Sequence, residues 1–177
     1  TGKAAMAGFA DVPGTRIIVF YPKDGVSRVQ ELQMVTQKGD NTSVVAIHGN
    51  FDDAQTGVKK IFADKEFGAE LADHGFQFSS ANSINIGRLV PQVVYYVYAY
   101  ASLLANEEIK DGEEINVTVP TGNFGNILAA YFAKQLGVPI KKLICASNDN
   151  KVLYDFFQTG TYDRQRDFIL TTSPSMD

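Results

Sequence analysis

A short glycine-containing turn between a strand pattern and a helical pattern constrains the fold of this chain more than any other feature. Residues 115–119 alternate β-branched and polar side chains, which predicts a strand. Residues 127–136 carry apolar side chains at helical spacing and end at Gly137, a favourable residue after a helix. The turn between them therefore joins a strand directly to a helix, and its sequence is Gly122-Asn123-Phe124-Gly125-Asn126.

The glycines of this turn allow a sharp change of direction and leave space for a ligand close to the backbone. The first amides of a helix have no partners within the helix, and the helix dipole places partial positive charge there. Such a helix start can bind a phosphate group through backbone and Asn amides, since the loop contains neither Lys nor Arg. The same residues also fit a strand-to-helix turn with a capping Asn and no ligand, and the loop composition leaves both interpretations open.

The rest of the chain alternates strand and helix patterns. A long helix is expected from about Ile86 to Asn106, and Asp52 or Asp53 is expected to cap an earlier helix. The mostly apolar strands predict an α/β fold with parallel, doubly wound sheets, in which ligands bind beyond the carboxyl ends of the strands. We expect two packed α/β units, residues 1–80 and 81–177. The expected strands are at residues 16–21, 43–48, 76–79, 115–119 and 143–147.

Composition excludes several classes of function. The chain has 177 residues and a net charge of -4, without a basic stripe, so nucleic acid is not an expected partner. Its one cysteine, Cys145, rules out an internal disulfide, favours the cytoplasm and is expected to be a buried, inert thiol. No cysteine–histidine spacing predicts a metal site. Residues 89–105 carry no charge, but Pro91, Gln92 and the tyrosines among them favour a buried amphipathic helix over a membrane span.

Five segments of the sequence form a distinctive series in this order along the chain: Thr1-Gly2-Lys3-Ala4-Ala5, Phe51-Asp52-Asp53-Ala54-Gln55, Asn82-Ser83-Ile84-Asn85-Ile86-Gly87-Arg88, Pro120-Thr121-Gly122-Asn123-Phe124-Gly125-Asn126 and Ser173-Pro174-Ser175-Met176-Asp177. Together they extend across essentially the full length, and they are far more specific than the glycine turn alone. In this order they resemble the threonine synthases. The resemblance implies a pyridoxal-phosphate enzyme of the tryptophan-synthase-like fold (fold type II) that converts O-phosphohomoserine and water to threonine and phosphate.

The same resemblance implies two groups of binding residues. The glycine turn is expected to hold the phosphate of the pyridoxal 5'-phosphate cofactor, through Gly122, Asn123, Phe124, Gly125 and Asn126. The substrate is expected to lie beside a second group, in which the guanidinium fork of Arg88 can bind an anion. The members of this second group are Thr1, Ser83, Asn85 and Arg88.

The resemblance also places catalytic groups outside the chain. In the family, the Schiff-base lysine belongs to a Phe-Lys-Asp motif upstream of the loop that matches Thr1-Gly2, whereas Lys3 follows that loop. The residue that partners the pyridine nitrogen is expected downstream of Asp177. We therefore expect a fragment of a longer enzyme, with no catalytic residue in this chain and no activity of the isolated chain. Residues 1–80 would form part of a smaller, mobile domain and residues 81–177 part of the larger cofactor domain.

Two alternative functions remain at this stage. The first is another fold type II lyase, related to threonine dehydratase or cysteine synthase. The second is a non-catalytic α/β module that binds phosphate. In each case the expected partner is a small molecule, with neither nucleic acid nor a membrane, and the sequence leaves the oligomeric state open.

Overall fold

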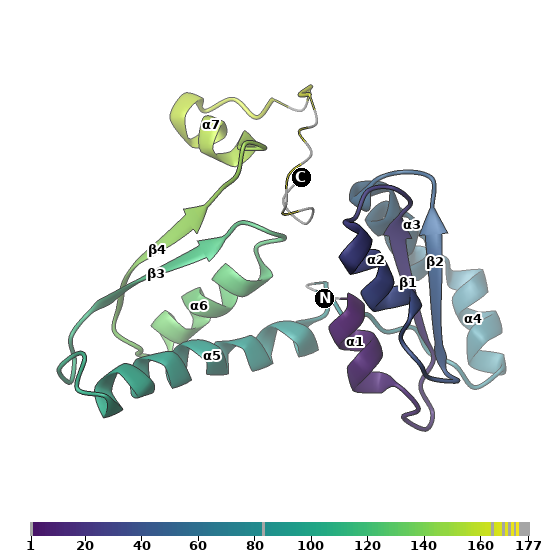
Figure 1. The fold of residues 1–177 in the computed structure, drawn as a ribbon, viewed down its shortest axis with the longest axis horizontal. Coiled ribbons are helices and arrows are strands. Elements are labelled where there is room, and N and C mark those ends of the chain that lie inside the picture. The colour runs from purple at the N-terminus through teal and green to yellow at the C-terminus, as the bar shows by residue number, and fades with distance from the viewer. Residues whose placement is uncertain are drawn as a thin grey trace. The chain divides into compact units, whose positions relative to one another are not determined.

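The chain folds as two α/β units, each built around a pair of parallel strands (Figure 1). The structure is a computed structural model and describes residues 2–82, 84–163, 165–167, 169, 171 and 173. The first unit ends at Ala81 and the second begins at Asn82. The strand pairs β1–β2 and β3–β4 are both parallel, which confirms the predicted parallel α/β class.

In the first unit, two helices cover one face of the strand pair (Figure 1). Met6 of α1 and Met34 of α2 pack against Tyr21 of β1, and these three side chains are the buried apolar core of this unit. The strands are in register from Ile17 opposite Thr42 onwards. The elements of this unit are α1 (Gly2–Phe9), β1 (Ile17–Pro22), α2 (Arg28–Val35), β2 (Thr42–Ile47), α3 (Phe51–Ala63) and α4 (Lys65–Asp73).

Two local predictions for the first unit need correction. The N-cap residue of α3 is Asn50, whose side chain accepts from the amide of Asp53 at 2.9 Å. Asp53 takes part in the cap from the third helical position, where its side chain accepts from the amide of Asn50 at 2.9 Å. Residues 76–79 do not form a strand. The ring of Phe78 instead packs against Phe62 and Phe67, with centroid distances of 5.2 and 5.6 Å, which places this segment against α3 and α4.

In the second unit, a long helix packs along α6, and α6 packs against the strands (Figure 1). The strands β3 and β4 are parallel, with a shift of register between Ile115 and Asn116. The predicted strand at 143–147 begins earlier, at Ile140. The elements of this unit are α5 (Ile86–Ala105), β3 (Ile115–Pro120), α6 (Gly125–Gln135), β4 (Ile140–Ala146) and α7 (Val152–Thr159).

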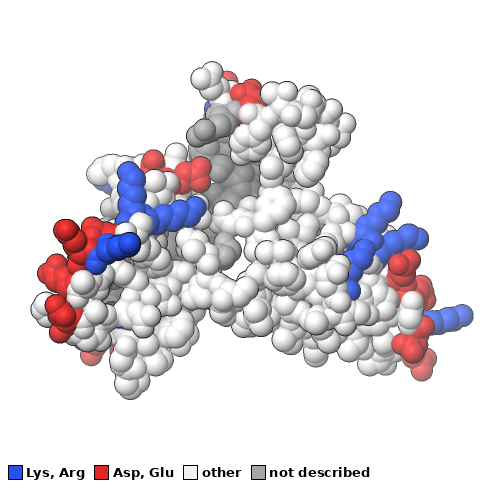
Figure 2. Space-filling model, turned by 180° about the vertical axis from the view of Figure 1, so that it is seen from behind, with Lys and Arg blue, Asp and Glu red and all other residues white. Residues whose placement is uncertain are grey.

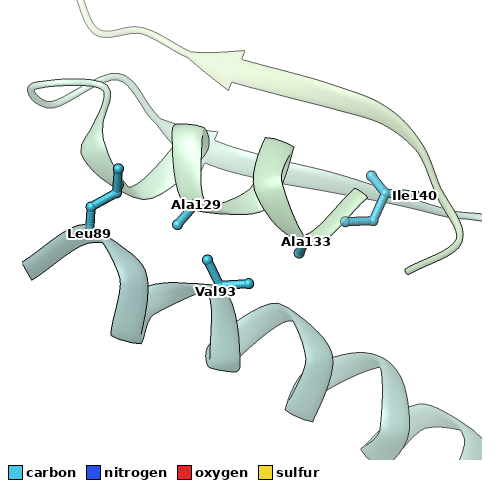
Figure 3. Packing of buried hydrophobic residues seen from close by; sticks show 5 residues of the cluster. All are labelled: Leu89, Val93, Ala129, Ala133 and Ile140. Atoms are coloured by element: carbon cyan, nitrogen blue, oxygen red, sulfur yellow. The ribbon is translucent and has the colours of Figure 1, made fainter. Parts of the chain in front are cut away.

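Small side chains form the contact between α5 and α6. Ala129 and Ala133 are completely buried and face Leu89 and Val93 of α5, with Ile140 beside them (Figure 3). Because alanine has no atoms beyond Cβ, the two helix backbones can approach closely, and added volume would have no space to enter. This contact fixes where α6 lies and therefore where its first turn lies.

The surfaces of both units carry apolar side chains as well as charges. Ile18 of β1 is 58% exposed, so the described residues leave its side of this apolar strand uncovered. Cys145 is exposed rather than buried, because its position in β4 is not covered within the part of the chain that the structure describes. On the face drawn in Figure 2, basic and acidic side chains lie beside one another in small groups and leave most of the surface uncharged. Within the described residues, no helix combines the length and the apolarity that a bilayer crossing needs.

We expect Ala133→Leu to destabilise the second unit strongly. The added side chain must enter the closed contact with α5, and overpacking of this kind costs about 1–3 kcal/mol. Urea denaturation of the variant and the unchanged chain measures the free energy of unfolding. Ala101→Leu makes the same change at an exposed position of α5 and should cost far less. Equal stability losses in the two variants would contradict the packing argument.

Candidate functional site

The turn after β3 is fixed to the neighbouring strand by Thr121. The amide of Thr121 donates to the carbonyl oxygen of Ala146 at 2.8 Å, and its hydroxyl donates to the same oxygen at 2.7 Å. Phe124 closes the turn by donating its amide to the carbonyl oxygen of Thr121 at 3.0 Å. The turn therefore lies at the carboxyl ends of β3 and β4, which is where parallel sheets bind their ligands.

Two residues of the turn adopt left-handed backbone conformations. Gly122 has φ of +41° and Phe124 has φ of +62°. For a residue with a side chain, such a conformation costs about 1–3 kcal/mol and is concentrated at functional sites. Phe124 is also the residue that caps α6, yet its side chain makes no capping hydrogen bond. The interpretation of this turn as an ordinary cap with an Asn is therefore wrong, because the cap position is held by a strained Phe.

Several amides around the start of α6 have no hydrogen-bond partner in the part of the chain that the structure describes. Leu128 is the first to donate within the helix, to the carbonyl oxygen of Phe124 at 3.0 Å. A Cβ placed on Gly122 would meet no atom within 4 Å, so open space borders the turn. An anion in that space would meet several donors and the positive end of the helix dipole. The amides that lack a hydrogen-bond partner among the described residues belong to Gly122, Asn123, Gly125, Asn126 and Ile127.

The side chain of Asn126 is bound to α5. Its Nδ2 donates to Gln92 Oε1 at 2.9 Å, and its Oδ1 accepts from the hydroxyl of Tyr96 at 2.5 Å. The side-chain amide of Asn126 is thus already in use, and only its backbone amide is open to an anion. The amide of Phe124 is likewise used inside the turn, so this residue shapes the turn rather than donating from its backbone.

The first turn of α5 carries the second group of candidate residues. Asn85 caps this helix, accepting from the amide of Gly87 at 2.8 Å. The Nε atom of Arg88 is buried without a hydrogen-bond partner, and no described residue forms an ion pair with this arginine. A buried donor without an acceptor costs about 1–3 kcal/mol, which indicates that an acceptor from outside the described residues belongs there. Thr1 and Ser83 lie outside the described residues.

Comparisons with known proteins place this arrangement in a family. The chain is 46% identical over 184 residues to human threonine synthase-like 1, covering 100% of this chain and 25% of that protein. It is 38% identical over its whole length to threonine synthase of Saccharomyces cerevisiae, covering 33% of that protein. The chain is homologous to a segment of the threonine synthases. No protein-family model matches the chain.

Solved threonine synthases also share the fold of this chain. The enzyme from Escherichia coli superimposes with a TM-score of 0.85 at 36% identity, covering 100% of this chain and 39% of that one. A threonine synthase from Brucella melitensis, solved with bound PLP, gives a TM-score of 0.77 at 43% identity, over 99% of this chain and 36% of that one. The predicted fold class and the predicted family are thereby confirmed. The chain spans about a quarter to a third of the length of the curated relatives that it matches.

Within this threonine synthase segment, the structure connects the two groups of predicted site residues through side chains that the sequence analysis did not assign. Gln92 and Tyr96 bind Asn126, and Gln92 also binds the backbone of Arg88. The signal that could have revealed them is the spacing of polar groups at i, i+4 and i+8 on an otherwise apolar helix. Among the described residues, no three His, Cys, Asp or Glu side chains come together as a metal site requires. The binding roles of the individual residues stay predictions.

We expect Gly122→Val to weaken phosphate binding at least about tenfold, since a β-branched residue disfavours a left-handed φ and its Cβ would enter the open space. Titration with inorganic phosphate, followed by the amide resonances of the turn, measures the affinity. Gly112→Val is the matched control, because Gly112 also has positive φ, +77°, and open space around it, but lies in a different turn. A loss of phosphate affinity that is equal in both variants would show that backbone strain alone explains it.

We expect Arg88→Met to make the unliganded protein more stable while weakening its anion binding. The apolar side chain removes a buried donor without an acceptor, so part of its penalty of about 1–3 kcal/mol should be regained. Urea denaturation and phosphate titration measure the two effects. Arg28→Met is the contrasting variant, since Arg28 binds Glu31 at 2.6 Å and its removal should not stabilise the chain. A less stable Arg88→Met variant would contradict the assignment of Arg88 to a ligand.

Proposed function

We propose that this chain forms the cofactor-phosphate site and part of the substrate site of a longer, pyridoxal-phosphate-dependent threonine synthase. One observation carries the proposal: a helix whose N-cap residue makes no side-chain capping hydrogen bond, closely following a parallel strand, in a chain homologous to a threonine synthase solved with bound PLP. The glycine turn that the family resemblance assigned to the cofactor is the turn in which every amide except that of Phe124 lacks a partner among the described residues. Sequence and geometry thus support the same site.

The residues of the turn fit a phosphate group. The amides of Gly122, Asn123, Gly125 and Asn126 are the donors, and Phe124 holds the left-handed conformation that leaves them open. A dianionic phosphate gains from these donors and from the dipole of α6 without a Lys or Arg in the turn. When it is bound, pyridoxal phosphate supplies an electron sink for reactions at substrate carbon atoms. The chain's own contribution is to hold and orient the phosphate end of that group.

The proposed substrate is O-phosphohomoserine, which reacts with water to give threonine and phosphate. Arg88 is the principal anion-binding side chain, since a guanidinium can bind a phosphate or carboxylate through two parallel hydrogen bonds. We assign Thr1, Ser83 and Asn85 to the same substrate site on the family resemblance. The unit up to Ala81 belongs to a smaller, mobile domain in this proposal, and the unit from Asn82 belongs to the larger cofactor domain. Closure of the smaller domain would exclude water until it is needed.

The catalytic lysine of the proposed enzyme is not part of this chain. Lys3 follows the loop that matches the family motif, and its Nζ donates to Gln37 Oε1. This amine already has a hydrogen-bond partner within its own unit. We therefore propose that the chain alone binds phosphate groups but does not catalyse the reaction, and that the whole protein acts in the cytoplasm.

The test compares phosphate release from O-phosphohomoserine by the full-length protein and by the 177-residue chain at equal concentration. We expect release, with formation of threonine, by the full-length protein only. Activity of the short chain that Gly122→Val abolishes would show that the catalytic lysine is in this chain, with Lys3 as the first residue to replace.

The same assay separates the alternative functions. A full-length protein that binds pyridoxal phosphate but does not release phosphate would contradict the threonine synthase activity, and deamination of threonine would then indicate a dehydratase. A protein that binds phosphate or nucleotides without preferring pyridoxal phosphate would be a non-catalytic module. This comparison is needed because the mammalian relatives are named for their likeness to threonine synthase.

A further inference from the structure

A chain of hydrogen bonds on α5 holds the side chain of Asn126. Asn126 Nδ2 donates to Gln92 Oε1 at 2.9 Å, and the hydroxyl of Tyr96 donates to Asn126 Oδ1 at 2.5 Å. At the other end, Gln92 Nε2 donates to the backbone carbonyl oxygen of Arg88 at 2.6 Å. Arg88, Gln92 and Tyr96 are spaced i, i+4 and i+8, so they lie along one face of α5. The network joins the proposed substrate side of the site to the start of α6.

The direction of every hydrogen bond in this network follows from one atom. The carbonyl oxygen of Arg88 can only accept, so Gln92 presents its NH2 group there and its Oε1 to Asn126. Asn126 must then present its own NH2 group to Gln92 and its Oδ1 to Tyr96, which leaves the hydroxyl of Tyr96 as the donor. Burial raises the pKa of the Tyr96 phenol, so the hydroxyl remains protonated and remains a donor at neutral pH. The side chains therefore have one consistent arrangement.

This network stabilises the first turn of α6 without using its amides. An Asn at the N-cap position accepts from the first backbone amides, and that bond would fill donors that an anion needs. In α6 that position is held by Phe124, which makes no such bond, and Asn126 is the second residue of the helix. Here Asn126 binds sideways to α5, while the amides of Gly125, Asn126 and Ile127 have no partner among the described residues. A helix start that is neither capped nor tied to a neighbour would lose its order and the common direction of its amides.

We infer that Gln92 and Tyr96 are positioning residues for the phosphate site: through Asn126 they aim the first amides of α6 at the phosphate group. This inference rests on the proposed function. In this inference neither side chain contacts the ligand. Replacing either one should therefore change only the part of the affinity that the phosphate group supplies. A purely structural tie between the helices would change stability and leave that part unchanged.

The experiment uses the full-length protein and two probes, pyridoxal phosphate and pyridoxal, which lacks the phosphate. Absorbance titration measures both dissociation constants. The constant for pyridoxal divided by the constant for pyridoxal phosphate gives the contribution of the phosphate group to the affinity. Tyr96→Phe removes one hydroxyl and keeps the ring. We expect the ratio to fall about three- to tenfold, the scale of one hydrogen bond, with the affinity for pyridoxal unchanged. The ³¹P resonance of bound pyridoxal phosphate should also move towards its position in free solution.

Tyr100→Phe is the matched control. Tyr100 is a buried tyrosine of the same helix, and its hydroxyl donates to the carbonyl oxygen of Glu113 at 3.2 Å. Its loss should lower stability to a similar degree, because a hydrogen bond of the same kind disappears, but the ratio of dissociation constants should stay as in the unchanged protein. Tyr98→Phe, at a position that is 73% exposed, should alter neither quantity.

Gln92→Met provides a second, independent variant, because it keeps the length of the side chain and removes both of its hydrogen bonds. Gln92→Met should lower the ratio as Tyr96→Phe does. In the double variant, the loss of phosphate-dependent binding free energy should be smaller than the sum of the two single losses, since both residues act through Asn126. An unchanged ratio in Tyr96→Phe and Gln92→Met would overturn this inference but not the proposed function. A fall of the ratio in Tyr100→Phe equal to that in Tyr96→Phe would do the same. Equal binding of both probes by the unchanged protein would overturn the proposed function and the inference with it.

Discussion

The contact between α5 and α6 is the interaction on which the proposed site depends. Its middle is apolar and closed, where Ala129 and Ala133 meet Leu89 and Val93 (Figure 3). Because the alanines set a short distance between the backbones, polar side chains at the amino-terminal end of the same contact can form bonds of ordinary length. The apolar part of the contact stabilises the helix pair, and the polar part sets the orientation of the first turn of α6. The conformation of the turn after β3 therefore depends on packing further along the helix.

The turn itself is strained, and the surrounding structure holds it in place. Gly122 and Phe124 both have left-handed φ, which is unfavourable for Phe124 by about 1–3 kcal/mol. Thr121 offsets this cost through two hydrogen bonds to Ala146 of β4, and the hydrogen bond from Phe124 to Thr121 closes the loop. Since the amide of Phe124 is used there, the strained residue fixes the shape of the site while its neighbours keep their donors open.

Much of the fold could be predicted from the sequence, because its signals are local. Apolar runs and helical spacing placed both strand pairs, the long helix α5 and the strand-to-helix turn. The predictions from the sequence were wrong where contacts between distant residues determine the structure. Residues 76–79 have a strand composition, but the ring of Phe78 packs on α3 and α4 instead of pairing in a sheet. Cys145 looked buried because its strand is apolar, whereas burial depends on what covers the strand.

The candidate site shows the same division. The turn was visible because its glycines and the strand and helix around it are adjacent in the chain. The bond between Gln92 and Asn126 was not, since these residues are 34 positions apart and nothing local to either one indicates its partner. The spacing of Arg88, Gln92 and Tyr96 marks a polar stripe on α5 but does not say what that stripe meets.

A phosphate site built from backbone amides is constrained differently from one built from cations. Its donors do not titrate and do not depend on side-chain identity, so the side chain of Asn123, which has no hydrogen bond within the described residues, is open to change. Recognition depends instead on backbone direction. That direction is set by the conformations of Gly122 and Phe124, by the lateral bonds of Asn126 and by the buried alanines of α6. In the proposed phosphate site, the residues that matter most to binding are therefore, in large part, residues that do not touch the phosphate.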